Sequence, residues 1–142
     1  MSDTAIHATM ITLGVTDIEN SAAFYEAMGL KRSSASQESV VFFDMGGLAL
    51  GLFGREALAD DADVPSHGEG FRGVAIAWNR PDEDEVDACI ARMVEAGGVV
   101  TKPAEKVFWG GYSGYFADLD GHVWEVAMNP FWTINDDGTL TL

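Results

Sequence analysis

Short stretches in which apolar and polar residues alternate predict strands, and two longer stretches with apolar residues every three or four positions predict helices. In the first half of the chain, residues 8–15 are expected to form a strand. A helix should follow, because Thr16 and Asp17 with Glu19 form a helix-start signature and Gly29 ends the apolar repeat. Residues 30–36 are predicted to form a modest edge strand, and residues 39–44 and 48–53 a hairpin. The order is βαβββ.

The second half predicts the same order of elements. Residues 54–70 are acidic, contain Pro65 and predict a linker with at most a short helical turn near residues 56–59. Residues 74–78 should form a strand, and Pro81 should open a helix that ends at Gly97 and Gly98. A strand at 99–102, a loop at 106–111 and a hairpin at 112–128 complete the unit.

These two halves align with each other. Residues 42–52, FFDMGGLALGL, match residues 116–126, FADLDGHVWEV, which places Asp44 on Asp118 and Gly51 on Glu125. Counting back from the helix starts places Met10 against Gly73. The sequence therefore predicts an α+β fold built from two βαβββ modules rather than a solenoid, because there are only two copies.

One carboxylate, Glu125, lies among apolar neighbours in the hairpin at residues 112–128. Asp118, Leu119, Asp120 and Gly121 provide the turn. If the hairpin is regular, side chains alternate between its faces. We then expect the face of Glu125 to carry also Val123, Ala127, Tyr112, Gly114 and Phe116.

The amino-acid composition limits the class of protein to which this chain can belong. A chain of 142 residues with 47% hydrophobic residues and no long apolar run suits one domain without a membrane span. No signal peptide is visible at the start, so a cytoplasmic location is expected. The single Cys89 occupies a core-like helical position and is expected to be a buried thiol rather than a nucleophile.

The net charge of −15 makes nucleic acid an unsuitable partner. A solvated acidic surface is the simplest explanation, and the charge alone does not name a ligand.

With VTDIENSAAFYEAMGL in the first unit and GYFADLDGHVWEV in the second, the chain resembles the vicinal oxygen chelate superfamily. Glyoxalase I, bleomycin-resistance proteins, fosfomycin-resistance enzymes and extradiol dioxygenases belong to that superfamily. The resemblance implies a single domain, residues 1–142, whose two modules curl around a shared cavity. Module one would span about residues 6–54, the linker 55–70, module two 71–130 and the tail 131–142. The stretch at residues 109–130 resembles a glyoxalase-like subgroup whose members mostly lack an assigned reaction.

In metal-using members of this family, four places on the first and last strands of each module hold a divalent cation such as Zn, Ni, Mn or Fe. Those places are Met10, Gly51, Gly73 and Glu125 here, and only Glu125 could ligate. One carboxylate with water holds a cation weakly, so we expect no tightly bound metal or other cofactor.

The three histidines are not expected to complete a metal site. His7 and His122 stand at odd offsets from the family positions, which turns them to the opposite strand face, although a bulge would reverse this. His67, on the linker, could reach a cavity mouth. A surface or hydrogen-bonding role is expected for each.

Small and aromatic residues on the expected face of Glu125 predict a pocket for an apolar or aromatic molecule. Glu125 would be the catalytic residue. The candidate ligand-binding residues are Met10, Phe42, Gly51, Gly73, Trp109, Tyr112, Gly114 and Phe116. A packed core filled by Trp78 or Trp109 is the competing interpretation. Glu125 could equally be a structural acid that Tyr112 or Trp109 hydrogen-bonds.

The leading hypothesis is a glyoxalase-like protein that binds a small, largely apolar or aromatic molecule without a tightly bound metal. In it, Glu125 orients the ligand or takes a proton. The first alternative is a divalent-metal-dependent enzyme similar to lactoylglutathione lyase or to a dioxygenase, which would recruit His67 or a displaced ligand.

The second alternative is a drug-binding protein similar to the bleomycin-resistance members, whose pockets commonly lie at a dimer interface. The resemblance thus allows a homodimer. The tail, with Phe131 and Trp132, would either pack back onto the domain or join that contact.

Overall fold

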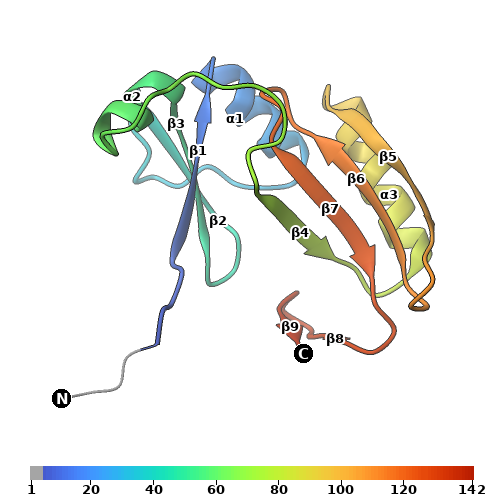
Figure 1. The fold of residues 1–142 in the computed structure, drawn as a ribbon. Coiled ribbons are helices and arrows are strands. Elements are labelled where there is room, and N and C mark those ends of the chain that lie inside the picture. Colours follow the sequence, from blue (N-terminus) through green and yellow to red (C-terminus); the bar gives the residue numbers. More distant parts are fainter. Residues whose placement is uncertain (1–4) are drawn as a thin grey trace.

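Two small mixed sheets, each with a helix packed on one face, make up the chain (Figure 1). The computed structural model describes residues 5–142. Module one contains β1 (Met10–Val15), α1 (Ile18–Ala27), β2 (Val40–Asp44) and β3 (Ala49–Gly54). Module two contains β4 (Ala75–Asn79), α3 (Glu83–Glu95), β5 (Val99–Lys106), β6 (Tyr112–Ala117) and β7 (Val123–Met128). The predicted α+β fold class is confirmed.

Both sheets place the first strand of the module beside its last. Sheet one has the order β1-β3-β2, with β1 parallel to β3 and β2 antiparallel to it. Sheet two has the order β4-β7-β6-β5, with β4 parallel to β7 and the other pairs antiparallel. The shared topology follows from the internal repeat, since in each module the strand that ends the hairpin after the helix lies parallel to the first strand.

The helices begin where the sequence places aspartates. Asp17 caps α1 by accepting a hydrogen bond from the Asn20 N–H at 2.9 Å, and Asp82 caps α3 by accepting from the Glu85 N–H at 2.8 Å. In α1 the cap is therefore Asp17 rather than Thr16. The buried face of α3 consists of Val86, Cys89 and Met93, at the three- and four-residue spacing of a helical stripe. Burial raises the pKa of the Cys89 thiol, as expected for a structural cysteine.

A single core joins the two modules. Alternate residues of each sheet point into it, with Leu13, Val41, Phe43 and Leu50 from sheet one and Phe116, Trp124 and Val126 from sheet two. Phe24 and Tyr25 of α1 lie between them. The modules thus meet through their helix-covered faces, and the opposite face of each sheet takes no part in this core.

Several parts of the chain differ from the sequence-based expectation. The strand predicted at residues 99–102 is longer, since β5 runs to Lys106. Residues 30–36 do not form a strand, because only Arg32 makes a single bridge, to Phe43. The linker holds a full helix, α2 (Arg55–Asp61), where only a turn was expected. The tail forms a small hairpin of β8 (Thr133–Ile134) and β9 (Leu140–Thr141), which lies near the ends of β4 and β7 in Figure 1. Within residues 5–142 no helix has the length and apolarity that crossing a membrane requires.

The turn between β6 and β7 links sheet two to module one through buried hydrogen bonds. Asp118 is 4% exposed, and its carboxylate accepts a hydrogen bond from the Tyr25 hydroxyl of α1 at 2.6 Å. The Trp124 indole N–H donates to the same hydroxyl at 3.1 Å. Burial, with the adjacent Asp118 charge, raises the pKa of Tyr25, so this phenol stays protonated and remains a donor.

Replacing Tyr25 with Phe should lower the free energy of unfolding by about 1–3 kcal/mol, because a buried carboxylate loses a donor that nothing replaces. Urea denaturation followed by tryptophan fluorescence measures this. Tyr112→Phe is the matched control, since the Tyr112 hydroxyl donates to Asp87 at 2.7 Å on the exposed surface. Its effect should stay within about 0.5 kcal/mol. Equal effects of the two substitutions would contradict the assignment.

Candidate functional site

Glu125 lies near the middle of β7 and is half-buried. Its direct neighbour across β6 is Tyr115, whose hydroxyl donates to Glu125 Oε2 at 3.0 Å. Its neighbour on the parallel side is Ala77 of β4, which is exposed. We call the surface formed by Ala75, Ala77, Tyr115, Val123 and Glu125 the open face of sheet two, because α3 covers the other side.

The expected companions of Glu125 lie elsewhere. Residues paired across antiparallel strands share a face, and Phe116 pairs with Trp124, Gly114 with Val126 and Tyr112 with Met128. Tyr112, Gly114 and Phe116 therefore point to the α3 side, and the predicted common face with Glu125 is wrong. The cause is the turn: five residues, 118–122, separate the paired Ala117 and Val123, whereas the sequence alignment implied a four-residue connection.

Packing accounts for two of these residues. Phe116 is 2% exposed and stacks on Trp124, with ring centroids 6.1 Å apart. A Cβ on Gly114 would stand 2.8 Å from Ile90 Cδ1 and 2.8 Å from the Ala104 nitrogen, so only glycine lets α3 and β5 approach here. Gly114 is thus explained by close packing rather than by room for a ligand.

In module one, three of the candidate residues lie together. Met10, Thr12, Phe42 and Gly51 share one face of sheet one by their strand pairing. A Cβ on Gly51 would lie 3.2 Å from Thr12 Oγ1, 3.5 Å from Met10 Sδ and 3.5 Å from Phe42 Cε1. Met10 is 44% exposed. We call this surface the open face of sheet one.

Gly73 and Trp109 lie outside both groups. Gly73 precedes β4 in a loop with φ of 82°, and no atom lies within 4 Å of a Cβ placed there. Trp109 is 36% exposed in the loop before β6, where its ring fills the space beside Gly111. Neither of them hydrogen-bonds Glu125, whose partner is Tyr115.

The donor atoms at the family's metal positions do not suit a divalent cation. Met10 offers a thioether, Gly51 and Gly73 offer no side chain, and Glu125 already accepts from Tyr115. Zn, Mn and Fe sites in proteins require several converging nitrogen, oxygen or thiolate ligands. Within residues 5–142, no three His, Cys, Asp or Glu side chains gather as they would around a metal ion.

Two cavities lie away from Glu125. The larger, of about 640 Å³, is lined by aromatic side chains of the core, including Phe116 and Trp78, and by residues 137–140 of the tail. Its basic group, Arg80, is already paired with Glu85 at 2.6 Å and placed over the Trp78 ring at 5.3 Å. The smaller, of about 390 Å³, lies at the junction of the modules between β1, α2 and the start of β4.

Sequence comparison agrees with the fold. The family model described as Glyoxalase/Bleomycin resistance protein/Dioxygenase superfamily matches residues 6–126. The chain belongs to this superfamily.

Relatives within the superfamily differ in what their names describe. A metallothiol transferase FosB from Shouchella clausii is 27% identical over 82% of this chain and 75% of its own length. The structure of a glyoxalase-related enzyme from Fulvimarina pelagi is 37% identical, with a TM-score of 0.85, covering 96% of this chain and 97% of that one. A lactoylglutathione lyase from Agrobacterium tumefaciens is 26% identical with a TM-score of 0.66, covering 93% and 98%.

Sequence reasoning missed the roles of two residues. The expected hydrogen-bond partner of Glu125 was Tyr112 or Trp109, but the partner in the structure is Tyr115. Asp118 was expected only to shape the turn, but its carboxylate also joins α1. If the turn had been taken as five residues long instead of four, the strand pairing would have placed Tyr115 opposite Glu125.

Partial burial, then the hydrogen bond to Glu125 and its negative charge, raise the pKa of Tyr115 above that of a free phenol. A raised folded-state pKa stabilises the fold below the unfolded value of about 10, and this contribution is lost as pH rises through the folded value. Alkaline titration of tyrosinate absorbance, as the difference between wild type and Tyr115→Phe, should have its midpoint above 10. Glu125→Gln should lower that midpoint, whereas Glu105→Gln should not. An unchanged midpoint in Glu125→Gln would rule out the pair.

Proposed function

We propose that this protein binds a small, largely apolar or aromatic molecule on the open face of sheet two, where Glu125 orients the ligand or accepts a proton from it. The observation that carries this proposal is the Tyr115–Glu125 pair, beside which the small, exposed Ala75 and Ala77 of β4 leave the sheet face open. Tyr115 engages Oε2, which leaves Oε1 to accept a hydrogen bond or proton from a ligand.

A second copy of the chain would close this site. The modules of one chain contact each other through their helix-covered faces, so the two open faces do not form that contact. Exposed Ala75 and Ala77 would then be buried against the Met10, Thr12 and Phe42 surface of the other copy. Apolar ligand sites bury most of the ligand surface, which one open sheet face does not achieve. We propose that the protein acts as such a homodimer in the cytoplasm.

Metal-dependent chemistry is the competing function, and the names of the metallothiol transferases and of the lactoylglutathione lyase favour it. The residues at Met10, Gly51 and Gly73 argue against it, because none provides a ligand for a hard or borderline cation. We therefore propose binding that needs no tightly held metal.

The role of Glu125 can be tested with 1-naphthol, a neutral aromatic probe with one hydroxyl donor. Glu125→Gln should weaken its binding by roughly tenfold, because a hydrogen bond to a charged acceptor is lost. Tyr115→Phe should weaken it less. Fluorescence titration measures both, with Glu105→Gln as a surface control on β5. Equal affinity in wild type and Glu125→Gln would overturn the proposed role.

Metal dependence requires a separate measurement. After chelation and dialysis, 1-naphthol affinity should be unchanged, and incubation with Zn, Ni, Mn or Fe should leave less than stoichiometric metal on the protein. Elemental analysis gives the ratio. A tight ion at one per chain that disappears in Glu125→Ala would establish the metal-dependent alternative instead.

The dimer can be tested by placing a charge on the open face. Ala77→Lys should dissociate a dimer into monomers in sedimentation velocity, since a buried unpaired charge is costly. Ala91→Lys is the matched control, because Ala91 is an exposed alanine of α3 on the covered side. A wild-type monomer at micromolar concentration, or equal behaviour of the two variants, would contradict the dimeric site.

A further inference from the structure

The smaller cavity, which we call the junction cavity, is lined by basic side chains although the protein as a whole is acidic. The chain has 8 Lys and Arg residues against 23 Asp and Glu residues. Two of these cations, Arg55 and Arg72, line the junction cavity together with His67 and His122, and none of its lining residues is acidic. Such a distribution is unexpected for a surface whose charge serves only solubility.

The two guanidinium groups lie close together over one neutral acceptor. Arg55 donates from Nη2 to the Gly68 carbonyl at 3.0 Å and from Nε to the Ser66 carbonyl at 2.8 Å. Arg72 donates to the same Gly68 carbonyl. A Cβ on Gly68 would stand 3.9 Å from Arg72 Nη1 and 4.0 Å from Arg55 Nη2, so both cations surround this point.

These backbone contacts leave most of the binding capacity of the arginines unused. A guanidinium carries five N–H donors, and the hydrogen bonds above occupy two on Arg55 and one on Arg72. Among residues 5–142, the ion pairs of the protein involve other cations than these two. Two neighbouring like charges repel each other, and an anion between them would relieve that repulsion.

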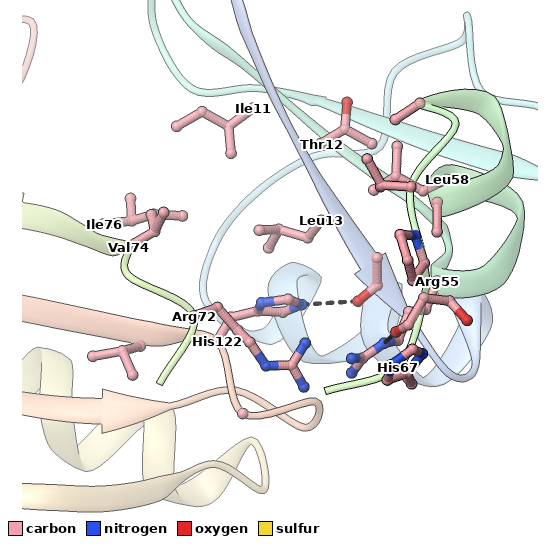
Figure 2. Close-up of a pocket in the computed structure, with 18 residues that line it drawn as sticks. Ile11, Thr12, Leu13, Arg55, Leu58, His67, Arg72, Val74, Ile76 and His122 are labelled. Atoms are coloured by element: carbon pink, nitrogen blue, oxygen red, sulfur yellow. Dashed lines mark hydrogen bonds between the residues drawn. The ribbon is translucent and has the colours of Figure 1, made fainter. Parts of the chain in front are cut away.

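The remaining wall of the cavity is mostly apolar, with Thr12 and Ser66 as its other polar side chains. Figure 2 shows Arg55, Arg72, His67 and His122 at one end, and Ile11, Leu58 and Ile76 toward the other. His122 is fixed in place because its Nε2 donates to the Gly14 carbonyl at 2.9 Å. Gly14 itself lets α2 approach, since a Cβ there would stand 3.0 Å from the Arg55 Cα. The volume of about 390 Å³ lies at the small end of the range for ligand sites.

We propose that the junction cavity binds a small amphipathic organic anion, with its carboxylate or phosphate head between Arg55 and Arg72 and its apolar tail against Ile11, Leu58 and Ile76. Planar guanidinium groups match both head groups, and the apolar wall explains why an inorganic anion alone would not fill the site. Glu125 and Tyr115 do not line this cavity, although Val123 borders both surfaces, and the proposal does not depend on the function proposed for the open face.

Isothermal titration calorimetry of the full chain with five probes tests the ligand class. Octanoate or octyl phosphate should bind at one per chain, and the tighter of the two identifies the head group. Octanol, with the same chain and no charge, should bind at least about tenfold more weakly, as should acetate and inorganic phosphate, which lack the tail. Octanol binding as tightly as octanoate would overturn the proposal.

Substitutions locate the site. Arg72→Gln should lower the affinity for the tighter-binding probe by about tenfold or more. Lys106→Gln, which removes one positive charge from β5 instead, should leave that affinity unchanged. Val74→Asp, which adds a carboxylate to the cavity wall, should abolish binding. Val99→Asp is its matched control, since Val74 is 63% exposed and Val99 62%. Binding that is unchanged in Arg72→Gln and Val74→Asp, or equally reduced in their controls, would refute the junction cavity as the site.

Discussion

The buried carboxylate of Asp118 is the contact on which the arrangement of the two modules depends. It accepts the Tyr25 hydroxyl of α1 and also the backbone N–H groups of Asp120 at 3.0 Å and His122 at 2.9 Å. The same turn reaches β1, because the Thr16 N–H donates to the Asp120 carboxylate at 2.8 Å. A buried carboxylate with several donors is stable only while all of them are present, so the turn and the module junction form together.

This turn also decides what surrounds Glu125. Its five residues bring Tyr115 opposite Glu125, and a connection one residue shorter would bring a neighbour from the other face instead. In module one, the four residues from Met45 to Leu48 join the paired Asp44 and Ala49. Gly51 and Glu125 do correspond between the modules, but their partners are Phe42 and Tyr115, which the alignment of the two halves did not match.

The local elements of the fold could be predicted from the sequence, whereas contacts between distant segments could not. Helical spacing and the aspartate caps identified α1 and α3, and turn residues identified both hairpins, because these signals lie within a few residues of each other. The strand expected at residues 30–36 is not formed. A strand there would need to pair along β2, and only Arg32 makes a bridge, to Phe43. Arg55, Arg72 and His122 are brought to one cavity by the junction of the modules, for which the sequence carries no periodic signal.

Side chains alternate between the two faces of each strand, which explains how one small domain can have both an open sheet face and a junction cavity. On β1, Met10 belongs to the open face of sheet one, Ile11 and Leu13 line the junction cavity, and Thr12 borders both. On β4, Ala77 lies beside Glu125 while Ile76 faces the cavity. A slip of one residue in either strand would exchange these surfaces and place apolar core residues on the open face. The Asp118 network holds the β6–β7 turn against the end of β1 and thereby places His122, which this turn carries, in the junction cavity, while the strand that follows carries Glu125 on the open face.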